Sequence, residues 1–324
     1  MTRGVALLGL GYVLSQFFRA FLAVLSPSLR VDLGATPEDL AFASGLWFFS
    51  FAAMQLPVGW ALDTVGPRRT AASLLLVGGG GGAALFAVAT QPLHINLAMV
   101  LIGIGCAPVL MGAYYIFARE FAPSRFVVLA SVMVGIGTLG NLVASYPMAI
   151  AAETIGWRAS LWGLCAITTL TAIGIWSVVR DPATPEGEQR GSLLGVFKIK
   201  ALWFIFPIMS VSYAQVGALR GLWIGPYFED VFAANAHQIG WATLLMGIAM
   251  VAGSLAYGPL DRVIGSTKWV IVGGTALNLA ALVALMLFPD SGIILATALM
   301  AAVGFFGATY AVIIAHGRSF MPPQ

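Results

Sequence analysis

The sequence predicts an all-α protein that crosses a membrane many times, and three observations support this fold class. First, 60% of the 324 residues are hydrophobic, only 9% are charged, and the mean hydropathy is +0.93. Soluble domains have about 45–50% apolar and about 25% charged residues. Second, the chain divides into ten apolar segments of membrane-spanning length. Third, its two halves repeat each other.

A spanning helix needs about 20 consecutive, mainly apolar residues. The ten segments are expected at 5–28, 39–62, 70–90, 95–118, 126–150, 158–179, 200–226, 237–259, 268–289 and 291–316. The first contains Arg19, which favours a retained span over a cleaved signal peptide. Cys106 and Cys165 fall inside spans and are predicted to be buried thiols, outside any disulfide framework or metal site.

The positions of the sixteen Lys and Arg residues predict the orientation, because basic residues near span ends stay in the cytoplasm. Twelve of them share one side: Arg3, Arg68, Arg69, Arg119, Arg125, Arg180, Arg190, Lys198, Lys200, Arg262, Lys268 and Arg318. Only Arg30 and Arg158 fall on the other side. The N-terminus is therefore predicted to be cytoplasmic, in a plasma membrane of the bacterial inner-membrane type. The net charge of +3 is mainly a topology signal, and no clustered basic face predicts nucleic-acid binding.

The internal repeat has an offset of 199 residues, as between Gln16 and Gln215. Further matches pair Pro27 with Pro226, Gly59 with Gly258, Gly66 with Gly265, Arg69 with Lys268 and, with a slip of one residue, Asp63 with Asp261. One period holds six spans, so both copies have the same orientation. We expect a six-helix bundle at 1–180, a cytoplasmic linker at 181–199 and a second bundle at 200–324. That second bundle holds only four spans, so its last two helices are expected to be missing from this chain.

The loop after the second span reads "GWALDTVGPRR", residues 59–69. Gly59 and Gly66 permit close helix approach and a tight turn. Asp63 lies at a helix end, where it can pair with Arg68 or Arg69 or accept backbone N–H bonds. The glycine run "VGGGGGAALF", 77–86, lacks the Lys-Ser/Thr of a phosphate loop and instead predicts close packing between helices.

Together, the six-span halves, the linker and this loop resemble the major facilitator superfamily of secondary transporters. The resemblance covers the whole chain, and the degraded echo "GPLDRVIGSTK" with Asp261 follows span eight, as in that family. It implies that Gly59, Asp63, Gly66, Arg68, Arg69 and Asp261 form a conformational motif that latches span two to span eleven. It also implies that spans one, four, seven and ten line a central cavity.

Two family motifs are weakened, because Met99 stands where span four carries Arg and Asn141 where the span-five antiporter pattern carries Pro. Both departures disfavour proton-driven drug export.

The two remaining basic residues, Arg19 and Arg220, fall within spans one and seven. A charge inside the membrane costs about 2.5–3.5 kcal/mol on insertion scales and usually has a function. All thirteen Asp and Glu residues fall in predicted loops or at span ends, so an anion is the simplest partner. Guanidinium forks suit carboxylate and phosphate oxygens, and a similar arginine pair occurs in the organophosphate:phosphate antiporters of the family. The alternative is that either side chain extends to an interface.

On span one, Tyr12, Gln16 and Arg19 have the spacing i, i+4, i+7 and should share one face. They form the first part of the predicted substrate site, although Gln16 can equally serve as a hydrogen bonder in helix packing.

On span seven, Tyr213, Gly217 and Arg220 have the same spacing and form the comparable stripe on one helical face. Gln215 completes the predicted site, but on a regular helix it points elsewhere, unless Gly217 and Gly221 relax the geometry.

The sequence thus favours a secondary active or facilitative transporter that moves a small anionic solute by alternating access. No nucleophile with a base is found, so an enzyme is not expected, and no cofactor or metal site is predicted. The expected surroundings are the lipid bilayer and the solute, and the expected state is a monomer. The alternatives are an efflux pump for drugs or amphipathic compounds and a truncated, non-transporting membrane scaffold.

Overall fold

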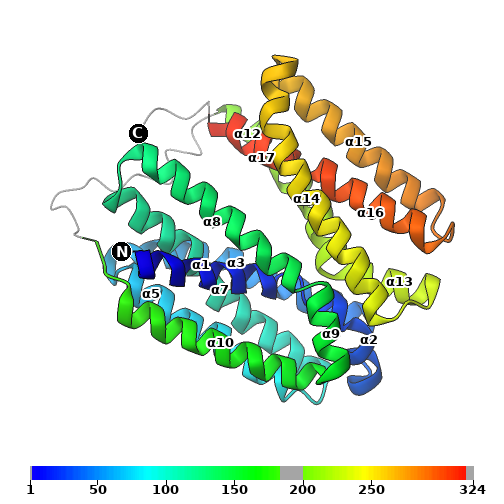
Figure 1. Cartoon of the computed structure of the whole chain (residues 1–324), viewed down its shortest axis with the longest axis horizontal. Coiled ribbons are helices and arrows are strands. Elements are labelled where there is room, and N and C mark those ends of the chain that lie inside the picture. The colour runs from blue at the N-terminus through cyan, green and yellow to red at the C-terminus, as the bar shows by residue number, and fades with distance from the viewer. Residues whose placement is uncertain (1, 183–199, 319–324) are drawn as a thin grey trace. The chain divides into compact units, whose positions relative to one another are not determined.

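The computed structural model describes residues 2–182 and 200–318, and every regular element in these residues is helical (Figure 1). The first half contains α1 (Thr2–Phe18), α2 (Leu22–Leu33), α3 (Pro37–Ala53), α4 (Gln55–Thr64), α5 (Pro67–Leu74), the π-helical segment η1 (Leu75–Gly80), α6 (Gly81–Ala87), α7 (Pro92–Glu120), α8 (Pro123–Val143), α9 (Tyr146–Thr154) and α10 (Trp157–Val178). The second half contains α12 (Lys200–Ala218), the π-helical segment η2 (Leu219–Trp223), α13 (Ile224–Phe232), α14 (Ala236–Ile264), α15 (Thr267–Leu287), α16 (Ile293–Gly307) and α17 (Thr309–Arg318). The predicted all-α class is confirmed.

Most of the predicted spans recur as long apolar helices. Within the described residues, seven segments are long and apolar enough to cross a membrane: Pro37–Thr64, Pro67–Ala87, Pro92–Glu120, Val132–Thr154, Trp157–Val178, Ala236–Tyr257 and Thr267–Leu287. An eighth is the pair Arg3–Phe18 and Leu22–Leu33, bent by 51° at the break between them. The other two predicted spans coincide with α12 to α13 and with α16 to α17. The chain is therefore a multi-pass membrane protein.

Helix boundaries follow from local signals. Thr36 caps α3, because its hydroxyl accepts a hydrogen bond from the backbone N–H of Asp39 at 3.1 Å while the Asp39 carboxylate accepts one from the N–H of Thr36 at 3.0 Å. Proline occupies the first turn of α3, α5, α7 and α8, where its missing N–H costs no helical bond. Gly34 ends α2 in the left-handed conformation with φ of 62°.

Contacts divide the chain into two compact units. The first comprises Met1–Thr184 with the short stretches Gly221–Pro226 and Asn235–Gly240, and the second comprises Pro185–Arg220, Tyr227–Ala234 and Trp241–Gln324. The predicted linker lies outside the described residues from 183 to 199.

In the first unit, α7 packs against α1, α3, α5, α6 and η1. Glycine allows these contacts. A Cβ atom on Gly78 of η1 would lie 2.6 Å from the backbone nitrogen of Gly105 in α7, and one on Gly103 would lie 2.6 Å from the carbonyl oxygen of Trp47 in α3. Backbones this close exclude any side chain between them. The glycine run is thus a packing surface, as its sequence predicts.

The end of the first unit away from the N-terminus is held by a polar cluster. The Asp32 carboxylate, in the last turn of α2, accepts a hydrogen bond from Trp157 Nε1 at 2.7 Å and pairs with Arg158 at 3.1 Å. Arg158 also donates to the carbonyl oxygen of Ala89 at 3.0 Å. One of the two basic residues predicted on the outer side therefore ties three helix ends together.

The second unit is organised around α12 and α14 to α17. Asn278 of α15 is buried, and its Nδ2 donates to the carbonyl oxygen of Val303 in α16 at 3.1 Å. Gly307 lets α16 approach Val216 of α12. A buried amide and a close glycine contact thus both contribute to the packing of these helices, as is common where the surrounding solvent is lipid.

Candidate functional site

Arg19 lies where the first span is broken. Helix α1 ends at Phe18 and α2 begins at Leu22, so Arg19 occupies the turn at the 51° bend. The side chain is half-buried, and its guanidinium carbon lies 5.3 Å from the ring centre of Trp47 on α3. Cation–π contacts of this kind contribute about 0.5–2 kcal/mol, which offsets part of the cost of a charge in the membrane.

Arg220 lies in the π-helical segment η2 and is only 4% exposed. The repeat offset places the break at 19–21 opposite 218–220, which overlaps Leu219–Trp223. Each half thus has an irregular turn in its first span at overlapping repeat positions, with Arg19 in one turn and Arg220, two positions further along the repeat, in the other. Irregular turns of this type in membrane helices frequently mark functional sites. Arg19 belongs to the first unit and Arg220 to the second.

Tyr12 and Gln16 share a face of α1, as predicted, and this face packs against α8. Gln16 Nε2 donates to Tyr12 Oη at 2.5 Å, and Asn141 Nδ2 of α8 donates to Gln16 Oε1 at 3.4 Å. Glycines bring the helices together, because a Cβ on Gly137 would clash with the Tyr12 ring and one on Gly140 with the backbone of Val13. The contacts favour the packing role for Gln16. Asn141, read from the sequence only as a replacement for proline, supplies the third member of this group.

In the second unit, Gln215 lies on α12 and is half-buried. Its Oε1 is buried and accepts no hydrogen bond within the described part of the chain. The side chains of Tyr213 and Asp261 lie outside the described residues. The span-seven stripe therefore remains a prediction.

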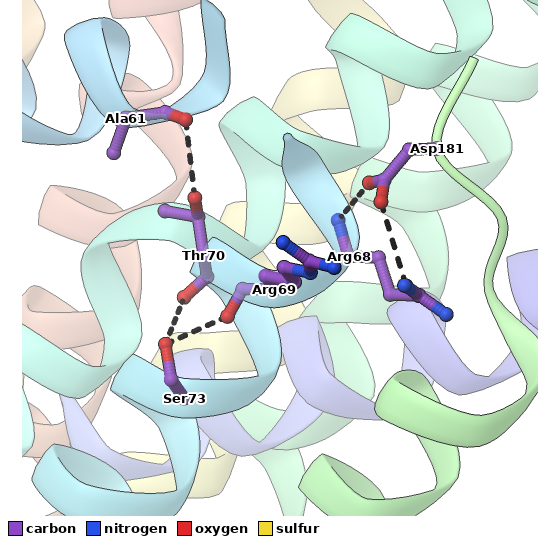
Figure 2. A network of polar contacts seen from close by, with 6 residues as sticks. All are labelled: Ala61, Arg68, Arg69, Thr70, Ser73 and Asp181. Atoms are coloured by element: carbon purple, nitrogen blue, oxygen red, sulfur yellow. Dashed lines mark hydrogen bonds and ion pairs between the residues drawn. The ribbon is translucent and has the colours of Figure 1, made fainter. Parts of the chain in front are cut away.

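The loop after the second span is held by Asp181, which follows α10 (Figure 2). The backbone N–H of Arg68 donates to Asp181 Oδ1 at 2.8 Å, and Arg68 Nε lies 3.4 Å from Oδ2 in an ion pair. Gly66 has φ of 96°, and a Cβ there would lie 2.8 Å from Asp181 Oδ1. Glycine is thus required twice, for its backbone angle and for the space that Asp181 fills.

Two predictions about the loop 59–69 are wrong. Asp63 is exposed and makes no hydrogen bond or ion pair within residues 2–182 and 200–318, so the expected pairing with a nearby arginine is wrong and Asp181 takes that role. Gly59 does not mediate a close helix contact, since a Cβ there would meet only Met111 Cε, at 3.9 Å. Arg69 is exposed, and its carbonyl oxygen accepts a hydrogen bond from Ser73 at 2.6 Å (Figure 2).

We expect Asp181→Ala to lower the stability of the first unit by about 1–2 kcal/mol, because it removes a charge-assisted hydrogen bond and a half-exposed ion pair. Asp181→Asn keeps an acceptor for the Arg68 N–H and should fall between this variant and the wild type. Thermal melting of detergent-purified protein measures both. Asp63→Ala is the matched control and should melt like the wild type. An Asp181→Ala protein as stable as that control would contradict the anchoring role.

Two further features of the first unit were not predicted. Tyr146 Oη of α9 and His237 Nε2 of α14 form a hydrogen bond at 2.7 Å, with their rings edge to face. A cavity of about 670 Å³ opens between the first turn of α1 and the ends of α7 and α10, with Arg3, Glu120, Arg180 and Asp181 on its wall. Within the described chain, no three His, Cys, Asp or Glu side chains lie close enough to hold a metal ion.

Comparison with known proteins gives three findings. The family model described as the Major Facilitator Superfamily matches residues 8–232. The "Uncharacterized transporter YybO" of Bacillus subtilis (strain 168) is 25% identical over 190 residues, and the match covers 59% of this chain and 43% of that protein. This chain therefore spans less than half the length of that curated relative.

Among solved structures, a bacterial homolog of the human lysosomal transporter Spinster, in an inward-facing and unoccupied conformation, superposes with a TM-score of 0.74 at 17% identity. The match covers 95% of this chain and 74% of the other. The nucleoside transporter NupG gives a TM-score of 0.71 at 16% identity, covering 97% and 81%. At these identities the likeness shows a shared fold.

Proposed function

Because this chain belongs to the Major Facilitator Superfamily, we propose that it is a secondary transporter for a small anionic solute. The observation that supports the proposal occurs in both halves: the first span of each half has an irregular turn that contains an arginine. A guanidinium group offers planar N–H forks that match carboxylate and phosphate oxygens. A charge placed in the membrane is costly, and a charge-assisted hydrogen bond to an anion is among the strongest contacts that a guanidinium group can make.

The proposed mechanism is rocking of the two halves, 1–180 and 200–324, around a site near the membrane midplane. Arg19 and Arg220 would bind the anion, with Gln215 and Tyr213 beside Arg220. Tyr12 and Gln16 would act mainly by fixing α1 against α8 through Asn141. The N-terminus would face the cytoplasm of a bacterial inner membrane, because twelve of the sixteen basic residues fall on its side. The chain would act as a monomer.

The loop 59–69 has a separate role in this proposal. Its attachment to Asp181 ties the second and third spans to the end of the sixth, so these spans would move as one body. Asp63 is exposed, which leaves its carboxylate accessible. Gly66 and Arg68 would hold the loop in shape, while Asp63, Arg69 and Asp261 would supply charges for the latch.

Anion uptake into proteoliposomes tests the proposal. Labelled phosphate, benzoate and nitrate would be offered to the wild-type chain with and without a pH gradient. We expect uptake of at least one anion, and strong loss of that uptake in Arg19→Gln and Arg220→Gln, because each variant removes a positive charge from the site. Unchanged anion uptake in both variants would contradict the proposal, as would uptake restricted to neutral amphipathic compounds.

A further inference from the structure

The surroundings of Arg19 are aromatic. Its guanidinium carbon lies 5.3 Å from the ring centre of Trp47, 5.7 Å from that of Phe51 and 6.0 Å from that of Phe48, all on α3. Trp47 stacks on Phe51 with centroids 5.1 Å apart and planes 13° apart, and meets Phe48 edge to face at 5.0 Å. Trp47 is buried, whereas Phe48 and Phe51 are each half-exposed. Two aromatic side chains beside the charge are therefore partly exposed.

Stacking and anion binding use different parts of a guanidinium group. A ring attracts the cation through its π face, whereas the N–H donors point outward in the guanidinium plane and bind oxyanions edge-on. One arginine can thus contact a ring and an oxyanion together. A solute held by Arg19 would bring the group next to its charged head within reach of Phe48 and Phe51.

We propose that the transported anion carries an aromatic ring beside its oxyanion head, so that the head pairs with Arg19 and the ring packs on Phe48 and Phe51. This inference rests on the proposed function. A small inorganic ion such as nitrate needs polar donors around it, but α3 offers ring carbon. A saturated anion would cover the same surface without the favourable ring geometry, which adds to the gain from burial.

A binding measurement on the purified full chain tests the ring preference. Labelled benzoate is displaced with cyclohexanecarboxylate, which has the same charge and a similar size but no π system. Phenyl phosphate and inorganic phosphate form a second matched pair, which separates the ring from the chemistry of the head group. We expect each aromatic anion to bind about 3-fold to 10-fold more tightly than its partner.

Leucine variants locate the effect. Phe48→Leu and Phe51→Leu keep much of the apolar volume but remove a ring, and each should bring the benzoate and cyclohexanecarboxylate affinities closer together. Phe49→Leu is the matched control on the same helix, because Phe49 is 72% exposed and makes no ring contact within the described residues. It should keep the full preference.

The outcomes separate the two proposals. If saturated and inorganic anions bind as tightly as aromatic ones, and binding still depends on Arg19, the aromatic inference is overturned while the anion proposal stands. If Phe48→Leu and Phe51→Leu both fold and retain the full preference, the assignment of the ring to α3 is overturned. If no anion binds in an Arg19-dependent way, both proposals fail.

Discussion

Gly78→Ala is expected to prevent the protein from accumulating in a folded form. The added Cβ would lie 2.6 Å from the backbone nitrogen of Gly105, 2.6 Å from the carbonyl oxygen of Leu101 and 2.7 Å from the Gly105 Cα. All three atoms belong to the backbone of α7, so no rotamer change relieves the clash. Overpacking usually costs about 1–3 kcal/mol, and contact with a rigid backbone places this variant at or above the upper end of that range.

The same glycine run supplies the control. Gly81 lies three residues further along, and a Cβ there meets nothing within 4 Å. Gly81→Ala should be neutral or stabilising, because alanine exceeds glycine in helix propensity by up to about 1 kcal/mol. Size-exclusion profiles of detergent extracts and melting temperatures measure both variants. Equal behaviour of the two would mean that η1 does not pack on α7 through Gly78.

Local patterns predict much of this fold. The span-length apolar segments, the glycine run and the proline-marked helix starts all follow from periodicity and composition, because each signal acts within one helix. The bend at Arg19 is different. No proline or glycine stands at 19–21, so the sequence predicts a continuous helix there, and the break is visible only in the structure.

Contacts between distant helices are the part that sequence reasoning misses. Asp181 pairs with Arg68 across 113 positions, and Asn141 reaches Gln16 across 125. A single sequence contains no signal for either pair, because many carboxylates and amides lie at similar span ends. The nearest acid in the chain, Asp63, is therefore the partner that the sequence predicts for Arg68 or Arg69. The glycines at 137 and 140 are the one clue to the α1–α8 contact, since such spacing favours close helix approach.

Arg220→Gln is expected to reduce transport of the anion about 100-fold or more. Arg220 is 4% exposed and lies in a π-helical turn, and removing one partner from a buried, hydrogen-bonded charge pair costs about 2–5 kcal/mol. Arg220→Lys retains the charge but replaces a planar fork with a point charge. We expect it to keep part of the activity, about 10-fold below wild type. The lysine variant loses the planar geometry but keeps the charge, and the glutamine variant loses both. The wild type and the two variants therefore form a graded series.

Initial uptake rates over a range of anion concentrations distinguish the two contributions. Loss of ground-state binding raises KM, whereas a failure to complete the transport step lowers the maximal rate. Arg125→Gln, an exposed arginine near the start of α8, removes the same charge far from the proposed site and should transport normally. A lysine variant equal to wild type would show that a point charge suffices, which removes the argument for bidentate recognition. A glutamine variant equal to wild type would make Arg220 a packing residue, and the interruption that recurs in both halves would then need a structural explanation.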